Sequence, residues 1–90
     1  MVYYYLIENS GMRVVYEYYS EGDKEKRPGI ITIDKVKESI ELTTPAERDF
    51  ESYAKEFDEH WWWYYDHARR RIVEDYNNGE IKKVGMAAWY

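Results

Sequence analysis

Five aromatic residues follow His60 without interruption, in the order Trp-Trp-Trp-Tyr-Tyr over positions 61–65. The run lies in a stretch whose apolar residues recur every three or four positions, which is the spacing of an amphipathic helix. Because successive helical residues turn by roughly 100°, five neighbouring side chains point all around the helix axis. One apolar face cannot hold them all. We therefore expect part of the run in the core of the domain and the rest on a second contact surface.

Two tryptophans of this run lie outside the core-facing stripe of the predicted helix. The stripe covers roughly 100° of the helix surface and consists of Phe50, Ala54, Phe57, Trp61, Tyr64, Tyr65, Ala68 and Ile72. Trp62 and Trp63 fall on the polar flanks, and Trp63 shares its flank with His67 and Arg70. Since buried tryptophan is a typical anchor of protein interfaces, we predict an association surface made by Trp62, Trp63, His67 and Arg70.

The helix that carries these residues is predicted to be long. Thr44-Pro45-Ala46-Glu47 has the capping box and first-turn proline of a helix start, and Asn77-Asn78-Gly79 is a typical stop. A continuous helix over 45–78 would measure roughly 50 Å, whereas strands of six or seven residues span about 20 Å. Three arrangements stay open: a homodimer through the helix, which we favour, a broken helix or curled sheet, and plain exposure of the overhang.

Five strands are predicted beside this helix, over residues 2–8, 12–19, 30–34, 39–42 and 81–90. Asn9-Ser10-Gly11 joins the first two strands into a hairpin. The first strand is apolar on both faces, which predicts a central position or a sheet covered on both sides. The order β-β-β-β-α-β predicts a single α+β domain over 1–90, with a mainly antiparallel sheet packed against one long helix.

The charge balance narrows the classes of partner. The 90 residues include 13 Lys and Arg against 18 Asp and Glu, a formal net charge of −5. This balance disfavours nucleic acid and anionic membranes, which need clustered positive charge. No apolar run approaches membrane-spanning length, and no signal-peptide pattern opens the chain. We therefore expect a cytoplasmic protein without membrane contact. The chain has no cysteine, which excludes disulfides and thiolate sites.

No pattern in the chain specifies a reaction. A Gly-rich phosphate loop, a nucleophile elbow and a metal-ligand spacing are all lacking from the sequence. His60 and His67 are separated by about 10.5 Å of helical rise, which is too far for both to bind one metal ion. Arg70 follows Asp66 by four residues, the spacing of an ion pair on a helix. We predict a non-enzymatic interaction protein without cofactor or metal, homodimeric through its helix aromatics, with a different protein partner also open.

Two alternatives remain from the residues. Tyr3, Tyr5 and Tyr19 of the predicted sheet, or the tryptophans of the helix, are candidates to stack on a sugar, on another flat ligand or on single-stranded nucleic acid. The other alternative is an acidic mimic of nucleic acid, which would need acidic side chains on one continuous face.

Short motifs over the C-terminal two-thirds of the chain resemble a known family. They are Gly29-Ile30-Ile31-Thr32-Ile33-Asp34-Lys35, Tyr53-Ala54, His67-Ala68 and the terminal Ala88-Trp89-Tyr90. The family consists of short uncharacterised proteins of Gram-positive bacteria and their mobile elements. It has no assigned activity, so the resemblance implies a bacterial domain and assigns a role to no residue.

Overall fold

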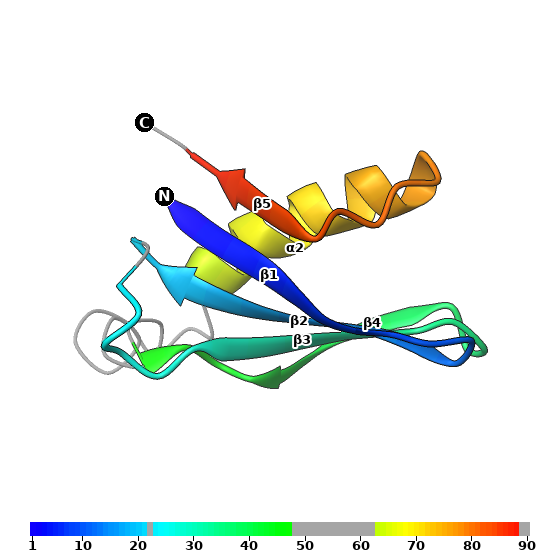
Figure 1. Ribbon diagram of the computed structural model, residues 1–90, viewed down its shortest axis with the longest axis horizontal. Helices are drawn as coiled ribbons and strands as arrows, with labels where there is room; N and C mark the ends of the chain where they lie inside the picture. Colours follow the sequence, from blue (N-terminus) through cyan, green and yellow to red (C-terminus); the bar gives the residue numbers. More distant parts are fainter. Residues whose placement is uncertain (22, 48–62, 89–90) are drawn as a thin grey trace.

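The computed structural model of the protein describes residues 1–21, 23–47 and 63–88. The elements are β1 (Val2–Asn9), β2 (Arg13–Ser20), β3 (Gly29–Asp34), β4 (Ser39–Thr44), α2 (Trp63–Asn77) and β5 (Val84–Ala87). All strand pairs are antiparallel, in the order β4-β3-β2-β1-β5, and α2 crosses one face of this sheet (Figure 1). The predicted α+β fold, with a mainly antiparallel sheet against a helix, is confirmed.

Strand β1 lies between β2 and β5, so it has a hydrogen-bonded neighbour on each side. This agrees with the interior position expected from its apolar residues on both faces. A register shift between Leu6 and Glu8 marks a β-bulge in its pairing with β2. The bulge leaves Ile7, which is 52% exposed, out of the ladder.

The last strand is shorter than predicted, because β5 begins at Val84 rather than at residue 81. The segment before it bridges from α2 to the sheet without joining the ladder. Ile81 packs against the core, and the carbonyl oxygen of Lys82 accepts a hydrogen bond from Tyr16 Oη at 2.6 Å. The backbone N–H of Leu6 also donates to the carbonyl oxygen of Lys83 at 2.8 Å, and Lys82 forms an ion pair with Asp75 at 3.3 Å. Side-chain packing and these polar contacts therefore hold residues that sequence periodicity assigned to a strand.

The core fills the space between α2 and the sheet. Its sheet side is formed by alternate residues of three strands: Val2 and Tyr4, then Val14, Tyr16 and Tyr18, then Ile31 and Ile33. Ala68 and Ile72 of α2 are buried against them, and Tyr64 and Tyr65 pack at the margin. These four helix residues belong to the predicted stripe. Phe50, Ala54, Phe57 and Trp61 lie outside the described residues.

Two glycines leave room for the rings of buried tyrosines. Gly29 is paired directly with Tyr18, and Gly85 with Tyr4. A Cβ atom at either glycine would overlap the ring of its partner tyrosine. The Tyr18 ring thus reaches across β3, where its Oη accepts a hydrogen bond from the backbone N–H of Ala46 at 3.0 Å. The two glycines allow large aromatic residues to fill a thin core.

Tyr16 is a strongly perturbed acid of the core. Its ring meets that of Tyr4 edge to face, with centroids 5.6 Å apart at an interplanar angle of 87°. Burial, with smaller contributions from Tyr4 and Asp75, raises the pKa of Tyr16 to about 12. The core therefore holds this phenol in its neutral form at ordinary pH.

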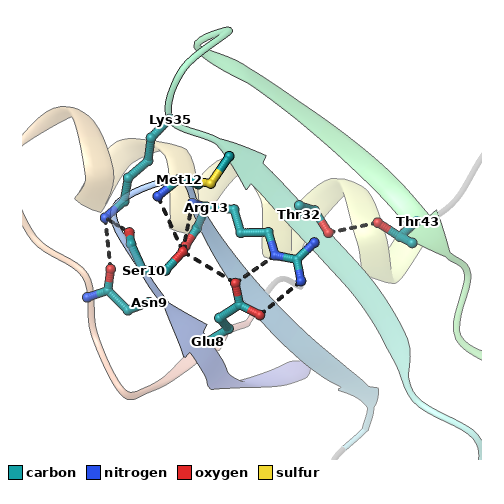
Figure 2. A network of polar contacts seen from close by, with 8 residues as sticks. All are labelled: Glu8, Asn9, Ser10, Met12, Arg13, Thr32, Lys35 and Thr43. Atoms are coloured by element: carbon teal, nitrogen blue, oxygen red, sulfur yellow. Dashed lines mark hydrogen bonds and ion pairs between the residues drawn. The ribbon is translucent and has the colours of Figure 1, made fainter.

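The turns at one end of the sheet are joined by polar contacts (Figure 2). Lys35 Nζ donates to Asn9 Oδ1 at 2.9 Å and to the carbonyl oxygen of Ser10 at 2.6 Å. Arg13 and Glu8 form a two-bond ion pair at 2.6 and 3.1 Å. The Lys35 contacts link the β1–β2 turn to the residue after β3, and the pair of Arg13 with Glu8 joins the two strands of the first hairpin.

Candidate functional site

The face of the sheet opposite α2 carries an ordered array of side chains from three neighbouring strands. Residues that pair directly across strands point to the same side of a sheet. One row of pairs is Tyr19 of β2, Tyr3 of β1 and Met86 of β5, and the next row is Glu17, Tyr5 and Val84. We call these six residues the tyrosine face.

The three tyrosines predicted as stacking residues are brought together on this face. The rings of Tyr5 and Tyr19 meet edge to face on the diagonal between the two rows, with centroids 5.7 Å apart at an angle of 74°. Tyr3 is paired directly with Tyr19. All three side chains are half-buried, whereas Met86 and Val84 beside them are 44% and 59% exposed. None of the three tyrosines belongs to the core cluster that α2 covers.

A cation already lies on this face. Lys24, from the loop between β2 and β3, places its Nζ atom 4.4 Å from the centroid of the Tyr5 ring. The loop is shaped by Asp23, whose N–H donates to the carbonyl oxygen of Ser20 at 3.0 Å and whose carboxylate accepts from the N–H of Glu25 at 3.0 Å. This turn carries Lys24 back over the end of the sheet, and the distance to Tyr5 lies in the range of a cation–π contact.

Glu17 gives the tyrosine face a negative charge. Its position in the ladder is directly opposite Tyr5. Burial first, and then the Glu17 carboxylate, raise the pKa of Tyr19, so the Tyr19 hydroxyl stays protonated at neutral pH. Among the residues that the structure describes, none forms an ion pair with Glu17. The face therefore combines aromatic rings, exposed apolar groups and one carboxylate.

The predicted association surface on the helix is described in part. Trp62 lies outside the described residues, and of Trp63 only the helical backbone is described. The predicted ion pair between Arg70 and Asp66 is confirmed at 3.2 Å, and Arg69 reaches the other oxygen of the same carboxylate at 3.3 Å. Arg70 is 66% exposed on a flank away from the core.

His67 lies on the same flank of α2 and is half-buried. Burial lowers the pKa of His67 below the ordinary histidine value, and the positive charge of Arg70 lowers it further. The negative charge of Asp66 raises this pKa, but by less than burial lowers it. His67 is therefore mainly neutral at neutral pH. Its role in association stays a prediction.

Hollows of the described surface also lie outside the six residues of the tyrosine face. One, of about 360 Å³, lies between the end of α2 and the β3–β4 hairpin, with Tyr76 and Ile40 in its lining. Another, of about 440 Å³, lies beside the contacts of Figure 2, with Arg13, Asp34 and Glu41 in its lining.

Within residues 1–21, 23–47 and 63–88, no group of three or more His, Asp or Glu could hold a metal ion.

Four residues of the site were not predicted from the sequence: Glu17, Val84, Met86 and Lys24. Val84 and Met86 join it only because β5 pairs with β1 in one particular register, which no local pattern specifies. Lys24 joins it through the conformation of a charged loop. The cluster of tyrosines in the first two strands was the signal available in the sequence. It predicted which tyrosines form the face, but it did not predict which residues of the last strand lie beside them.

Comparisons of the chain with protein-family models, with curated proteins and with solved structures gave no match. The resemblance to short proteins of Gram-positive bacteria therefore stays a prediction. No helix in the described part of the chain is long and apolar enough to cross a membrane.

Proposed function

We propose that this chain is a non-enzymatic interaction protein and that the tyrosine face is its contact surface for a protein partner. The observation that carries the proposal is the array of three tyrosines with the exposed Met86 and Val84 on the sheet face opposite α2. Tyrosine and methionine are enriched in the centres of protein interfaces, where a few such side chains supply most of the binding free energy.

The size of the array suits the central part of an interface. Three adjacent strands span about 10 Å and two rows of one face lie about 7 Å apart. A standard interface covers about 800 Å² on each partner, so the partner would also contact residues around the six. Glu17 within the array disfavours a phosphate backbone as the partner. A single carboxylate among five uncharged side chains also gives no support to an acidic mimic of nucleic acid.

The flank of α2 that carries His67 and Arg70 is our second proposed association surface. The exposure of Arg70 on that flank favours it. We propose that this flank, together with Trp62 and Trp63, forms the homodimer contact expected from the sequence. The cytoplasmic location is part of the same proposal. Light scattering tests the homodimer: a dimer mass is expected, and a monomer mass would contradict it.

Site-specific photo-crosslinking tests the proposed contact face. Tyr19 or Arg70 is replaced by p-benzoylphenylalanine, and each protein is irradiated in cells. We expect crosslinks to a different protein from position 19 and to a second copy of this chain from position 70. A partner that crosslinks from position 70 and never from position 19 would contradict the tyrosine face as the partner surface.

A further inference from the structure

We propose that the tyrosine face recognises a lysine or arginine side chain in a basic segment of the partner protein. In the free protein Lys24 occupies the position that this cation would take over the Tyr5 ring. The inference rests on the proposed function, because it names the chemistry of the partner that the tyrosine face binds.

The position over Tyr5 already accepts an ammonium group. Lys24 Nζ lies 4.4 Å from the ring centroid, well inside the limit of about 6 Å for attraction by an aromatic ring. No ion pair joins Lys24 to another described residue, so its ammonium group is held there without a carboxylate partner. The face of the Tyr5 ring is therefore open enough to receive a cation.

The surroundings of Tyr5 favour a positive group over a negative one. Glu17 stands directly opposite Tyr5 in the ladder, and its carboxylate has no cationic partner among the described residues. The chain as a whole carries a net charge of −5. A basic segment would gain long-range attraction on approach, whereas the phosphates of a nucleic acid would be repelled. The Tyr19 ring beside Tyr5 and the exposed Met86 offer apolar surface for the aliphatic part of a lysine or arginine.

Lys24 then acts as a tethered competitor for the position over Tyr5. The turn at Asp23 holds one end of the loop that carries Lys24. The local concentration of the Lys24 ammonium group at the Tyr5 ring is therefore high, and it does not depend on the concentration of the partner protein. An incoming cation must displace it. Arginine has an advantage in this exchange, since its planar guanidinium stacks on an aromatic ring and is less strongly hydrated than an ammonium.

Calorimetric titration with decalysine tests the proposal, and oligothymidylate and decaglutamate serve as comparison ligands. We expect decalysine to bind with an affinity that falls as salt is added, and neither comparison ligand to bind. Lys24→Gln should tighten decalysine binding by about two- to fivefold. Lys37→Gln is the matched control, because it makes the same charge change in the exposed turn at the opposite end of β3. Equal effects of the two substitutions would overturn the inference.

Substitutions of Tyr5 separate the aromatic ring from its hydroxyl. Tyr5→Phe keeps the ring and should bind decalysine as the wild type does. Tyr5→Leu keeps an apolar side chain without a ring and should bind about five- to thirtyfold more weakly. Unchanged binding by Tyr5→Leu would overturn the inference.

One measurement needs no variant. The ε-methylene resonance of Lys24 should be shifted upfield by the Tyr5 ring in the free protein and should return toward its ordinary position as decalysine binds. A resonance that stays in place while decalysine binds would overturn the inference. If crosslinks from position 19 capture a partner while decalysine fails to bind, this inference is refuted and the proposed contact face stands.

Discussion

Replacement of Gly29 by alanine should destabilise the protein far more than the loss of a glycine normally does. Gly29 lies in β3 opposite Tyr18, and the added Cβ would occupy the space of the Tyr18 ring. That ring is fully buried, so it cannot move aside into solvent. The strand must shift, or the ring must leave its place in the core.

The cost has two parts. Overpacking a well-packed core costs about 1–3 kcal/mol. A displaced ring also withdraws Tyr18 Oη from the N–H of Ala46, which lies 3.0 Å away in a buried site, and a buried donor without a partner costs about 1–3 kcal/mol. We expect Gly29→Ala to lower the free energy of unfolding by about 2–5 kcal/mol. In a domain of this size the midpoint temperature should fall by at least about 8 °C.

Urea unfolding followed by circular dichroism measures this change, with Gly11→Ala as the control. A Cβ at Gly11 would meet nothing within 4 Å, so that substitution should change stability by no more than about 1 kcal/mol. A double-mutant cycle with Tyr18→Val sharpens the test, because the cost of Gly29→Ala should shrink once the ring is absent. Equal costs for the two glycine substitutions, or a cost that persists without the ring, would refute the reasoning.

Two further predictions concern stability. The pKa of Tyr16 is raised to about 12 in the folded protein from an ordinary value of 10.0. The contribution of the neutral Tyr16 phenol to the free energy of unfolding is therefore complete below pH 10 and is lost as the pH rises toward 12. The loss should be about 2–3 kcal/mol, and urea unfolding across this pH range should show a smaller decline for Tyr16→Phe; equal declines would contradict the assignment. Glu38 has a positive φ of 54° in the β3–β4 turn, so Glu38→Gly should stabilise the protein by about 0.5–1 kcal/mol in thermal unfolding, whereas a loss of stability would show that the turn is not strained there.

The fold class follows from features that are local in the sequence. A run rich in tyrosine and aliphatic residues placed β1, and alternating apolar residues placed β2. The turn at residues 9–11 joined them, and the three- and four-residue spacing placed Ala68 and Ile72 against the core. The pair of Asp66 with Arg70 followed from helical spacing alone. Each of these depends on neighbours within a few positions, which is why periodicity predicts them.

The remaining features depend on contacts between distant segments. The pairing of Tyr5 with Val84 depends on the path of the chain between the end of α2 and the start of β5. The four residues of β5 carry no alternation of apolar and polar side chains that would fix the register of the strand. The need for glycine at position 85 appears only once Tyr4 lies across it. The prediction for Trp62 is untested because that residue lies outside the described part of the chain.

The most direct test of the tyrosine face is a map of where a basic ligand contacts the protein. Decalysine is added to isotopically labelled protein and the shifts of side-chain and backbone resonances are followed. We predict that the largest changes fall on Tyr3, Tyr5, Tyr19 and Met86, together with Lys24. Changes centred on Asp66 and Glu74 of α2, with the tyrosine resonances unmoved, would contradict the account.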